Sequence, residues 1–229
     1  MRRGGRTTSL QGVLFDWDGT LLDSYHADAQ AYLAMFAAMG IDWDLGDLER
    51  HYSPDWYHVY RAAKLPREHW EEADRAWRKF YRRQKPVLLP GARSVLQELK
   101  LAYRLGLVTS GSRWRVLSQL RTFGLTRLFA ARVCGGDTPQ RKPHPGPLQA
   151  AMGRMGIEAH ACVYVGDTPE DLEMARRAGV RAIAVLGPFP TRKQVRAERP
   201  EFLLKSIQEL PRLLRRLEKS LVPKEWSGA

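Results

Sequence analysis

Two aspartates follow directly on an apolar run near the start of the chain. In "VLFDWDGTLLDS" (residues 13–24), Asp16 and Asp18 are separated by one residue, and Gly19 and Thr20 come next. Carboxylates this close together repel each other unless a cation neutralises them. Hard oxygen ligands of this kind suit Mg²⁺, which keeps several waters and shares its coordination shell with phosphate. The stretch therefore indicates metal-assisted chemistry where a strand ends.

Polar residues also follow three later strand-like runs. Thr109 and Ser110 end the run 104–110, Lys142 lies in the loop after the run 131–137, and Asp167 ends the run 161–167, with Asp171 four residues further on. A single polar residue after a strand usually serves only as a helix cap. Four loops that deliver carboxylates, a hydroxyl and an ammonium group together are not explained by capping.

The elements that must position these side chains alternate between strand and helix. Short apolar runs predict strands at 11–16, 104–110, 131–137, 161–167 and 181–186, with helical spacing between them. This alternation predicts an α/β fold, a Rossmann-like parallel sheet covered on both faces. In such sheets the active site lies at the carboxyl ends of the strands.

One section of the chain interrupts this alternation. From residue 24 to about 86 the apolar residues recur at helical spacing, as in Tyr25, Ala29, Leu33 and Phe36, and no strand-like run occurs. We therefore expect an α-helical insertion over residues 23–86. The core domain would comprise residues 10–22 and 87–220.

Composition narrows the classes of protein. The chain has 229 residues, of which 44% are hydrophobic, so it can bury a core. No apolar run approaches the roughly 18 residues that a membrane span needs, and the start lacks the apolar region of a signal peptide. Cys134 and Cys162 lie in strand-like runs, and we interpret them as buried thiols of a cytoplasmic protein.

The net charge of +12 has two interpretations. One is a nucleic-acid partner, because a basic patch neutralises phosphates. The other is a solvated, arginine-rich surface that attracts small anionic substrates. The arginines are scattered and no nucleic-acid-binding motif accompanies them, which favours the second.

The residues at the strand ends fit a phosphate ester. Asp16, Asp18 and Asp167 would form the Mg²⁺ ligand set. A phosphoryl group could lie between the metal and Lys142, because lysine is a compact point charge. Thr109 and the backbone amides of the glycine-containing turns would hold the remaining phosphoryl oxygens.

Four segments occur in the order typical of one superfamily: "FDWDGT", "LVTSGS", "RKPHP" and "VGDTPED". Over residues 12 to about 190 the chain resembles the haloacid dehalogenase superfamily of phosphohydrolases. It is most similar to the phosphoglycolate phosphatase-like and β-phosphoglucomutase-like members. The resemblance implies that the helical insertion is a C1-type cap domain.

The resemblance also implies roles for individual residues. Asp16 would be the nucleophile that forms an aspartyl-phosphate, and Asp18 would act as general acid and base, with its backbone carbonyl on the metal. Asp171 would support Lys142 or a metal-bound water. The metal site would thus include Asp16, Asp18, Asp167 and Asp171, and the substrate would meet Trp17 (through its backbone amide), Gly19, Thr20, Ser110 and Gly111.

Within the superfamily, Asp18 indicates phosphate-ester chemistry, because the dehalogenases and phosphonatases lack an aspartate at this position. The predicted activity is Mg²⁺-dependent hydrolysis of a small phosphomonoester such as phosphoglycolate or a sugar phosphate. A β-phosphoglucomutase-type phosphomutase shares the motifs and stays open. A non-enzymatic binding module would be favoured by the loss of Asp16, Asp18 or Lys142, and all three are present.

Two further questions also stay open. The segment 50–61 is rich in aromatic residues and histidine, and it forms either specificity determinants or a small helical core. The chain could be a monomer or a homodimer.

Overall fold

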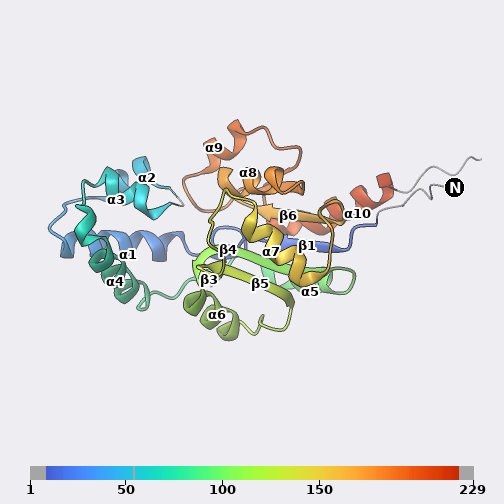
Figure 1. Ribbon diagram of the computed structural model, residues 1–229, viewed down its shortest axis with the longest axis horizontal. Helices are drawn as coiled ribbons and strands as arrows, with labels where there is room; N and C mark the ends of the chain where they lie inside the picture. Colours follow the sequence, from blue (N-terminus) through green and yellow to red (C-terminus); the bar gives the residue numbers. More distant parts are fainter. Residues whose placement is uncertain (1–8, 54, 222–229) are drawn as a thin grey trace, which may run out of the picture.

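A parallel sheet forms the centre of the computed structural model, which describes residues 9–53 and 55–221 (Figure 1). In these residues six parallel strands lie in the order β5-β4-β1-β6-β7-β8. Their bounds are β1 Gly12–Phe15, β4 Arg104–Ser112, β5 Phe129–Gly135, β6 Cys162–Gly166, β7 Arg181–Val185 and β8 Leu203–Leu204. The central place of β1 puts Asp16, the next residue, in the middle of the carboxyl edge of the sheet.

Helices cover both faces of the sheet because successive strand residues point in opposite directions. Val13 and Phe15 belong to the cluster beneath α5 and α10, whereas Leu14 belongs to the cluster beneath α7 and α8. All three side chains are fully buried. The helices of the core are α5 Ala92–Lys100, α6 Arg113–Thr122, α7 Gly146–Met155, α8 Pro169–Arg177, α9 Arg192–Ala197 and α10 Leu210–Leu221, with short 3₁₀ helices at Ala159–Ala161 and Ile207–Glu209.

Four helices form a separate layer beside the carboxyl edge, which we call the cap (Figure 1). They are α1 Tyr25–Ala38, α2 Leu45–His51, α3 Trp56–Ala62 and α4 Trp70–Tyr81, with a 3₁₀ helix at Arg67–His69. The cap has its own hydrophobic cluster, which includes Tyr32, Phe36, Leu48 and Tyr60. The chain enters and leaves it through two antiparallel strands, β2 Leu22–Asp23 and β3 Val87–Leu88.

The predicted fold class is confirmed, and the five predicted strands lie within two residues of their expected bounds. The third strand was placed two residues too late, since β5 ends at Gly135 and Asp137 lies in the turn that follows. The two-residue strands β2, β3 and β8 were missed because alternation cannot show in so short a run. The domain boundaries 10–22, 23–86 and 87–220 stay predictions.

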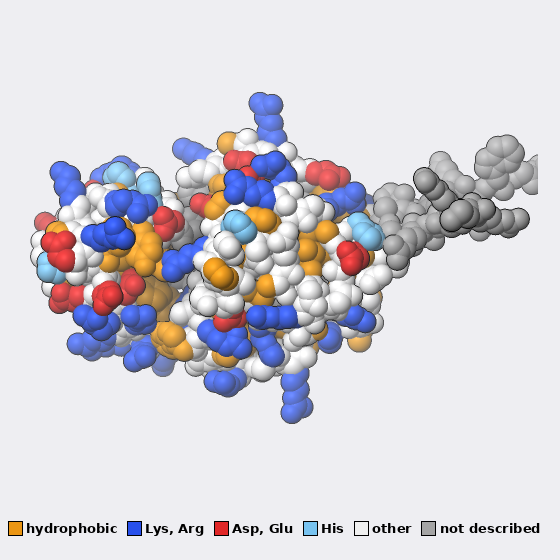
Figure 2. Space-filling model, in the orientation of Figure 1, with side chains coloured by type: hydrophobic (Ala, Val, Ile, Leu, Met, Phe, Trp, Pro, Cys, Tyr) orange, Lys and Arg blue, Asp and Glu red, His pale blue; other side chains and the backbone are white. Residues whose placement is uncertain are grey.

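The surface carries both signs of charge. Figure 2 shows Lys and Arg side chains on cap and core alike, with Asp and Glu side chains among them. No helix in residues 9–53 and 55–221 combines the length and the apolar character that a membrane crossing requires.

Candidate active site

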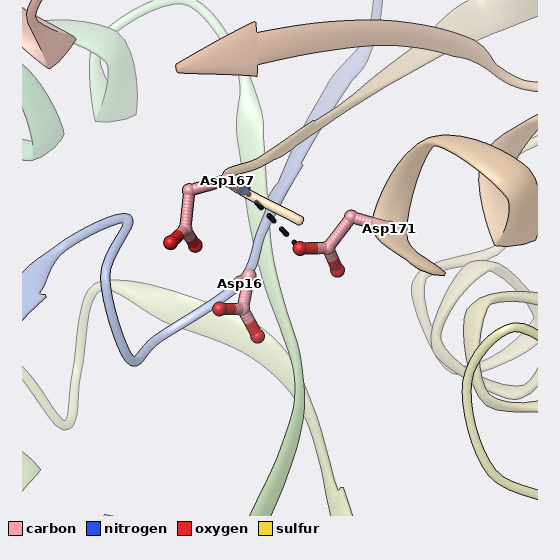
Figure 3. Close-up of side chains that lie close together, drawn as sticks. All are labelled: Asp16, Asp167 and Asp171. Atoms are coloured by element: carbon pink, nitrogen blue, oxygen red, sulfur yellow. Dashed lines mark hydrogen bonds between the residues drawn. The ribbon is translucent and has the colours of Figure 1, made fainter. Parts of the chain in front are cut away.

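Three carboxylates meet at the carboxyl edge of the sheet (Figure 3). Asp16 follows β1, Asp167 follows β6, and Asp171 lies in the first turn of α8. One oxygen of each lies within 4.8 Å of one oxygen of the other two, and all three residues are buried. The convergence of separate βα loops that the sequence predicted therefore occurs for these residues.

Lys142 joins this group from the loop after β5. Its Nζ donates to Asp16 Oδ1 at 2.5 Å and to Asp171 Oδ1 at 2.7 Å, and its side chain is 8% exposed. Burial alone favours the neutral amine, but the two carboxylates outweigh it and raise the pKa of Lys142. Burial raises the pKa of Asp16 to about 7, against the lowering effect of Lys142.

Asp171 is fully occupied by protein donors. Its Oδ1 accepts from Lys142 and from the Tyr164 hydroxyl at 2.9 Å. Its Oδ2 accepts from the Thr168 hydroxyl at 2.9 Å and from the backbone N–H groups of Asp167 and Thr168 at 3.2 Å. The bond to Lys142 agrees with one of the two roles that the sequence left open, support of Lys142 or of a metal-bound water. The place of Asp171 among the metal residues stays a prediction.

Asp167 has the opposite character. Its Oδ1 accepts from the Thr20 hydroxyl at 2.8 Å, whereas its Oδ2 is buried without a hydrogen-bond partner. Burial and the neighbouring Asp16 raise the pKa of Asp167. A buried carboxylate oxygen without a donor is costly unless a cation neutralises it, and the donor set here is oxygen from Asp16 and Asp167, as Mg²⁺ prefers. The residues present fit such a metal.

Two glycines keep the space around that oxygen open. A Cβ atom on Gly19 would lie 2.1 Å from Asp167 Oδ2, and one on Gly187 would lie 2.5 Å from it. Gly19 also has a φ of +82°, a conformation that side chains disfavour. Gly19 and Thr20, predicted to touch the substrate, therefore surround the metal-ligand candidate Asp167.

Asp18 is not part of the three-carboxylate cluster and forms an ion pair of its own. Arg115 of α6 donates to its Oδ1 at 2.8 Å and to its Oδ2 at 2.6 Å, and the Ser24 hydroxyl donates to Oδ1 at 2.8 Å. Burial raises the pKa of Asp18, but the Arg115 guanidinium outweighs it and the pKa lies below its usual value. The side chain of Asp18 is thus ion-paired. The predicted metal contact through its backbone carbonyl stays a prediction.

Arg115 is a site residue that the sequence analysis missed. It is 7% exposed, and besides Asp18 it contacts the ring and hydroxyl of Tyr81, the last residue of α4 in the cap. Gly111 makes its path possible, because a Cβ atom there would lie 2.3 Å from Arg115 Nη2. Its buried position could not be told from the sequence, since arginine is common and scattered along the chain.

A cavity of about 360 Å³ lies between the cluster and the cap. Its core wall includes Asp16, Asp18, Lys142 and the predicted Thr109, Ser110 and Gly111. The Thr109 hydroxyl accepts from the Gly111 N–H at 3.0 Å. The predicted residue Trp17 does not present its indole here: that side chain is fully buried in the core, and its Nε1 donates to Gln119 at 2.8 Å.

The cap wall of the cavity is mostly aromatic. It comprises Asp28, Tyr32, Tyr52, Ser53, Trp56, Tyr57, Tyr60, Asp74, Trp77, Arg78 and Tyr81. The segment 50–61 contributes five of these residues, and Tyr60 also belongs to the cap cluster. The segment therefore contributes to the small helical core of the cap, and its part in specificity stays a prediction. Its histidines, His51 and His58, are exposed and are not among the residues of the wall.

A comparison with known proteins agrees with this strand order and with the polar residues at the carboxyl edge of the sheet. A family model described as haloacid dehalogenase-like hydrolase matches residues 13–185. The chain belongs to this family. The predicted family and enzyme class, a hydrolase of the phosphatase type, are thereby confirmed.

Two relatives of this hydrolase carry different names. This chain is 28% identical over 212 residues to pyrophosphatase PpaX of Bacillus pumilus. The match covers 89% of this chain and 95% of the relative. It is 29% identical over 216 residues to phosphoglycolate phosphatase of Neisseria meningitidis, which covers 88% of this chain and 92% of the relative.

Solved structures show the same architecture. CbbY of Rhodobacter sphaeroides in complex with phosphate matches with a TM-score of 0.76 at 25% identity, covering 88% of this hydrolase and 96% of that chain. A putative phosphoglycolate phosphatase of Lactobacillus plantarum matches with a TM-score of 0.80 at 21% identity, covering 90% and 99%. The second likeness concerns the fold alone.

Proposed function

We propose that this hydrolase is a Mg²⁺-dependent phosphatase that hydrolyses a small phosphomonoester through an aspartyl-phosphate on Asp16. The observation that carries the proposal is the pair of buried carboxylates that meet at the carboxyl edge of the sheet: Asp16, held by Lys142, and Asp167, with an unpartnered Oδ2. One can attack phosphorus while the other, with Asp16, would hold the cation. When bound, Mg²⁺ would neutralise phosphoryl charge beside the nucleophile.

The first half of the reaction transfers the phosphoryl group to the protein. An Asp16 oxygen attacks phosphorus, the bond from phosphorus to the ester oxygen breaks, and Asp18 donates a proton to the departing alkoxide. Lys142 neutralises negative charge on Asp16 and on the phosphoryl oxygens. Thr109, Ser110 and Gly111, the cavity-lining residues near the end of β4, would hold the remaining phosphoryl oxygens.

The second half returns the protein to its starting state. Asp18, now a carboxylate, takes a proton from a water molecule whose oxygen attacks phosphorus, and the bond to Asp16 breaks. The products are inorganic phosphate and a free Asp16 carboxylate. Because Arg115 occupies both oxygens of Asp18 and holds the pKa of its carboxyl group below the usual value, Asp18 must separate from Arg115 and take up a proton from solvent before it can act as the acid of the first half.

The experiment is phosphate release from a panel of phosphomonoesters, with Mg²⁺ and with a chelator, for the wild type and the Asp16→Asn variant. We expect release that needs Mg²⁺ and is lost in the variant. The exposed cap variant Asp42→Asn is the matched control and should keep full activity. No release from any ester would refute the phosphatase, and isomerisation of a sugar phosphate without release would identify the phosphomutase instead.

Localisation in the cytoplasm and a small phosphorylated substrate as a partner belong to the same proposal. We infer that the positive charge attracts anionic substrates and does not bind nucleic acid. A mobility shift on DNA or RNA that weakens with salt would contradict this inference.

A further inference from the structure

The cap wall of the cavity contains a carboxylate outside the ion pairs of the site. Asp28 lies on α1 and lines the cavity, and no ion pair to it occurs in the described part of the chain. The Trp77 indole N–H lies close enough to Asp28 to lower its pKa. Its geometry, however, is not that of a hydrogen bond. The catalytic scheme above makes no use of Asp28, and a carboxylate accepts more than one hydrogen bond, so Asp28 can accept from a substrate donor besides the nearby Trp77 N–H.

The surroundings of Asp28 are unfavourable for a second anion. Burial and the nearby Asp18 raise the pKa of Asp28 to about 7, and the Arg115 charge that opposes this effect is already paired with Asp18. Asp74 adds another carboxyl group to the same wall, where it accepts from the Tyr60 hydroxyl at 2.8 Å. A substrate carboxylate or second phosphate would meet like charge here.

The positively charged residues that line the cavity are exposed, are paired with Asp18, or belong to the phosphoryl end of the site. Arg78 and Arg141 are exposed residues, and the Arg141 guanidinium lies over the Trp56 ring at 4.3 Å from its centroid. Lys142 belongs to the phosphoryl end, between Asp16 and Asp171. Apart from the exposed Arg78, the cap wall therefore offers acceptors and aromatic rings rather than cations.

Aromatic rings form a continuous surface beside Asp28. Tyr32 lies 6.3 Å from Trp77 and 6.5 Å from Tyr60 between ring centroids, and Trp77 stacks on Tyr81 at 4.7 Å. Aromatic faces pack well against the C–H face of a ring, and a carboxylate accepts two or more hydrogen bonds from hydroxyl groups. Together they suit a ligand that is apolar on its face and hydroxylated at its edge.

We propose that the cap wall recognises a hydroxylated ring, so that the substrate is the phosphate monoester of a cyclic sugar whose hydroxyl groups donate to Asp28. This inference rests on the proposed phosphatase activity and specifies its substrate class. The volume agrees: a cavity of about 360 Å³ lies within the range of roughly 300–1,000 Å³ that small-molecule sites occupy.

The test compares esters of primary alcohols that differ only in what the cap can recognise. Sugar phosphates (glucose 6-phosphate, mannose 6-phosphate and ribose 5-phosphate) offer a ring and hydroxyls, cyclohexylmethyl phosphate offers the ring alone, and ethyl phosphate offers neither. Phosphoglycolate tests whether the cap prefers a second anionic group, and adenosine 5′-monophosphate tests whether it prefers a nucleobase. We expect the best sugar phosphate to have the highest kcat/KM, followed by cyclohexylmethyl phosphate.

The Asp28→Asn variant then tests the residue. Loss of a hydrogen bond to a charged acceptor is expected to lower kcat/KM for the best sugar phosphate about 10- to 150-fold relative to cyclohexylmethyl phosphate. The exposed cap variant Asp42→Asn is the control and should leave this ratio unchanged. Calorimetric binding of the sugar phosphate to Asp16→Asn, with and without Asp28→Asn, should show the same loss without turnover.

The outcomes separate the two proposals. If ethyl phosphate and every other ester resist hydrolysis, the phosphatase itself is refuted. If esters are hydrolysed but phosphoglycolate or adenosine 5′-monophosphate exceeds every sugar phosphate, only the sugar proposal is overturned. An unchanged ratio in Asp28→Asn overturns the role of Asp28, and circular dichroism of the variant shows whether a loss comes from unfolding.

Discussion

Replacing Arg115 by methionine removes the partner of Asp18 but keeps a long apolar side chain in its place. The ion pair is bidentate, at 2.8 and 2.6 Å, and the two side chains are 8% and 22% exposed. Breaking a buried ion pair by removing one partner costs about 3 to 5 kcal/mol, because the other charge is left without compensation. Asp18 keeps its hydrogen bond from the Ser24 hydroxyl and stays partly exposed to water. We therefore expect Arg115→Met to lower the free energy of unfolding by about 3 kcal/mol.

The assay is urea unfolding near pH 7 within a double-mutant cycle of Arg115→Met and Asp18→Asn. The amide that Asp18→Asn introduces is neutral, so no charge is left unpaired when Arg115 is also removed. The double variant should therefore be more stable than the sum of the single effects predicts, by about 2 kcal/mol. Arg93→Met, at an exposed position of α5, controls for the loss of one arginine and should change stability by no more than about 0.5 kcal/mol.

One result would refute this reasoning. If Arg115→Met costs less than about 1 kcal/mol and its effect adds to that of Asp18→Asn, the two side chains behave as exposed, independent charges. Asp18 would then need no separation from Arg115 before it acts as an acid or base.

Two further changes test the metal side of the site, and a third tests the space that Arg115 occupies. Thr20→Val removes the hydroxyl that orients Asp167 and should weaken Mg²⁺ binding about 10- to 100-fold, measured by calorimetric titration. Asp167→Asn removes a buried carboxylate that faces Asp16, so the metal-free protein should unfold at a higher temperature while its response to Mg²⁺ disappears. Gly111→Ala would place a Cβ atom 2.3 Å from Arg115 Nη2 and should lower the free energy of unfolding by about 1 to 3 kcal/mol.

Each of these changes has its own contrary result. Unaltered Mg²⁺ affinity in Thr20→Val would show that Asp167 needs no orienting group. A lower melting temperature of metal-free Asp167→Asn would mean that the carboxylate is not repelled in the wild type. Full stability of Gly111→Ala would show that Arg115 has room to move aside. Gly153→Ala, where a Cβ atom meets nothing within 4 Å, is the control for glycine replacement.

The groups at the phosphoryl end could be predicted because each follows a strand directly. Asp16 and Asp167 come one residue after β1 and β6, so their place at the sheet edge is fixed by local chain geometry. Lys142 lies in a loop, yet that loop follows β5 and must start at the same edge. The strand pattern and the rule for carboxyl ends therefore suffice for these three residues.

The substrate end could not be predicted in this way. Arg115 and Asp28 lie on helices, where the sequence shows which residues share a face but not which neighbour the face meets. The partnership of Arg115 with Asp18 spans 97 positions in the chain. Trp17 shows the reverse case. It lies between two site residues in the sequence, yet its indole packs in the core.

The chain crosses between core and cap twice, and the two crossings are neighbours. Leu22 pairs with Leu88 and Asp23 with Val87, so residues on either side of the whole cap meet in one short ladder. A segment whose ends lie side by side can be exchanged or replaced without cutting through the structure that flanks it. The cap can therefore be replaced as a unit. A different cap inserted between β2 and β3 could redirect the enzyme to a different leaving group, while Asp16, Lys142 and Asp167 stay as they are.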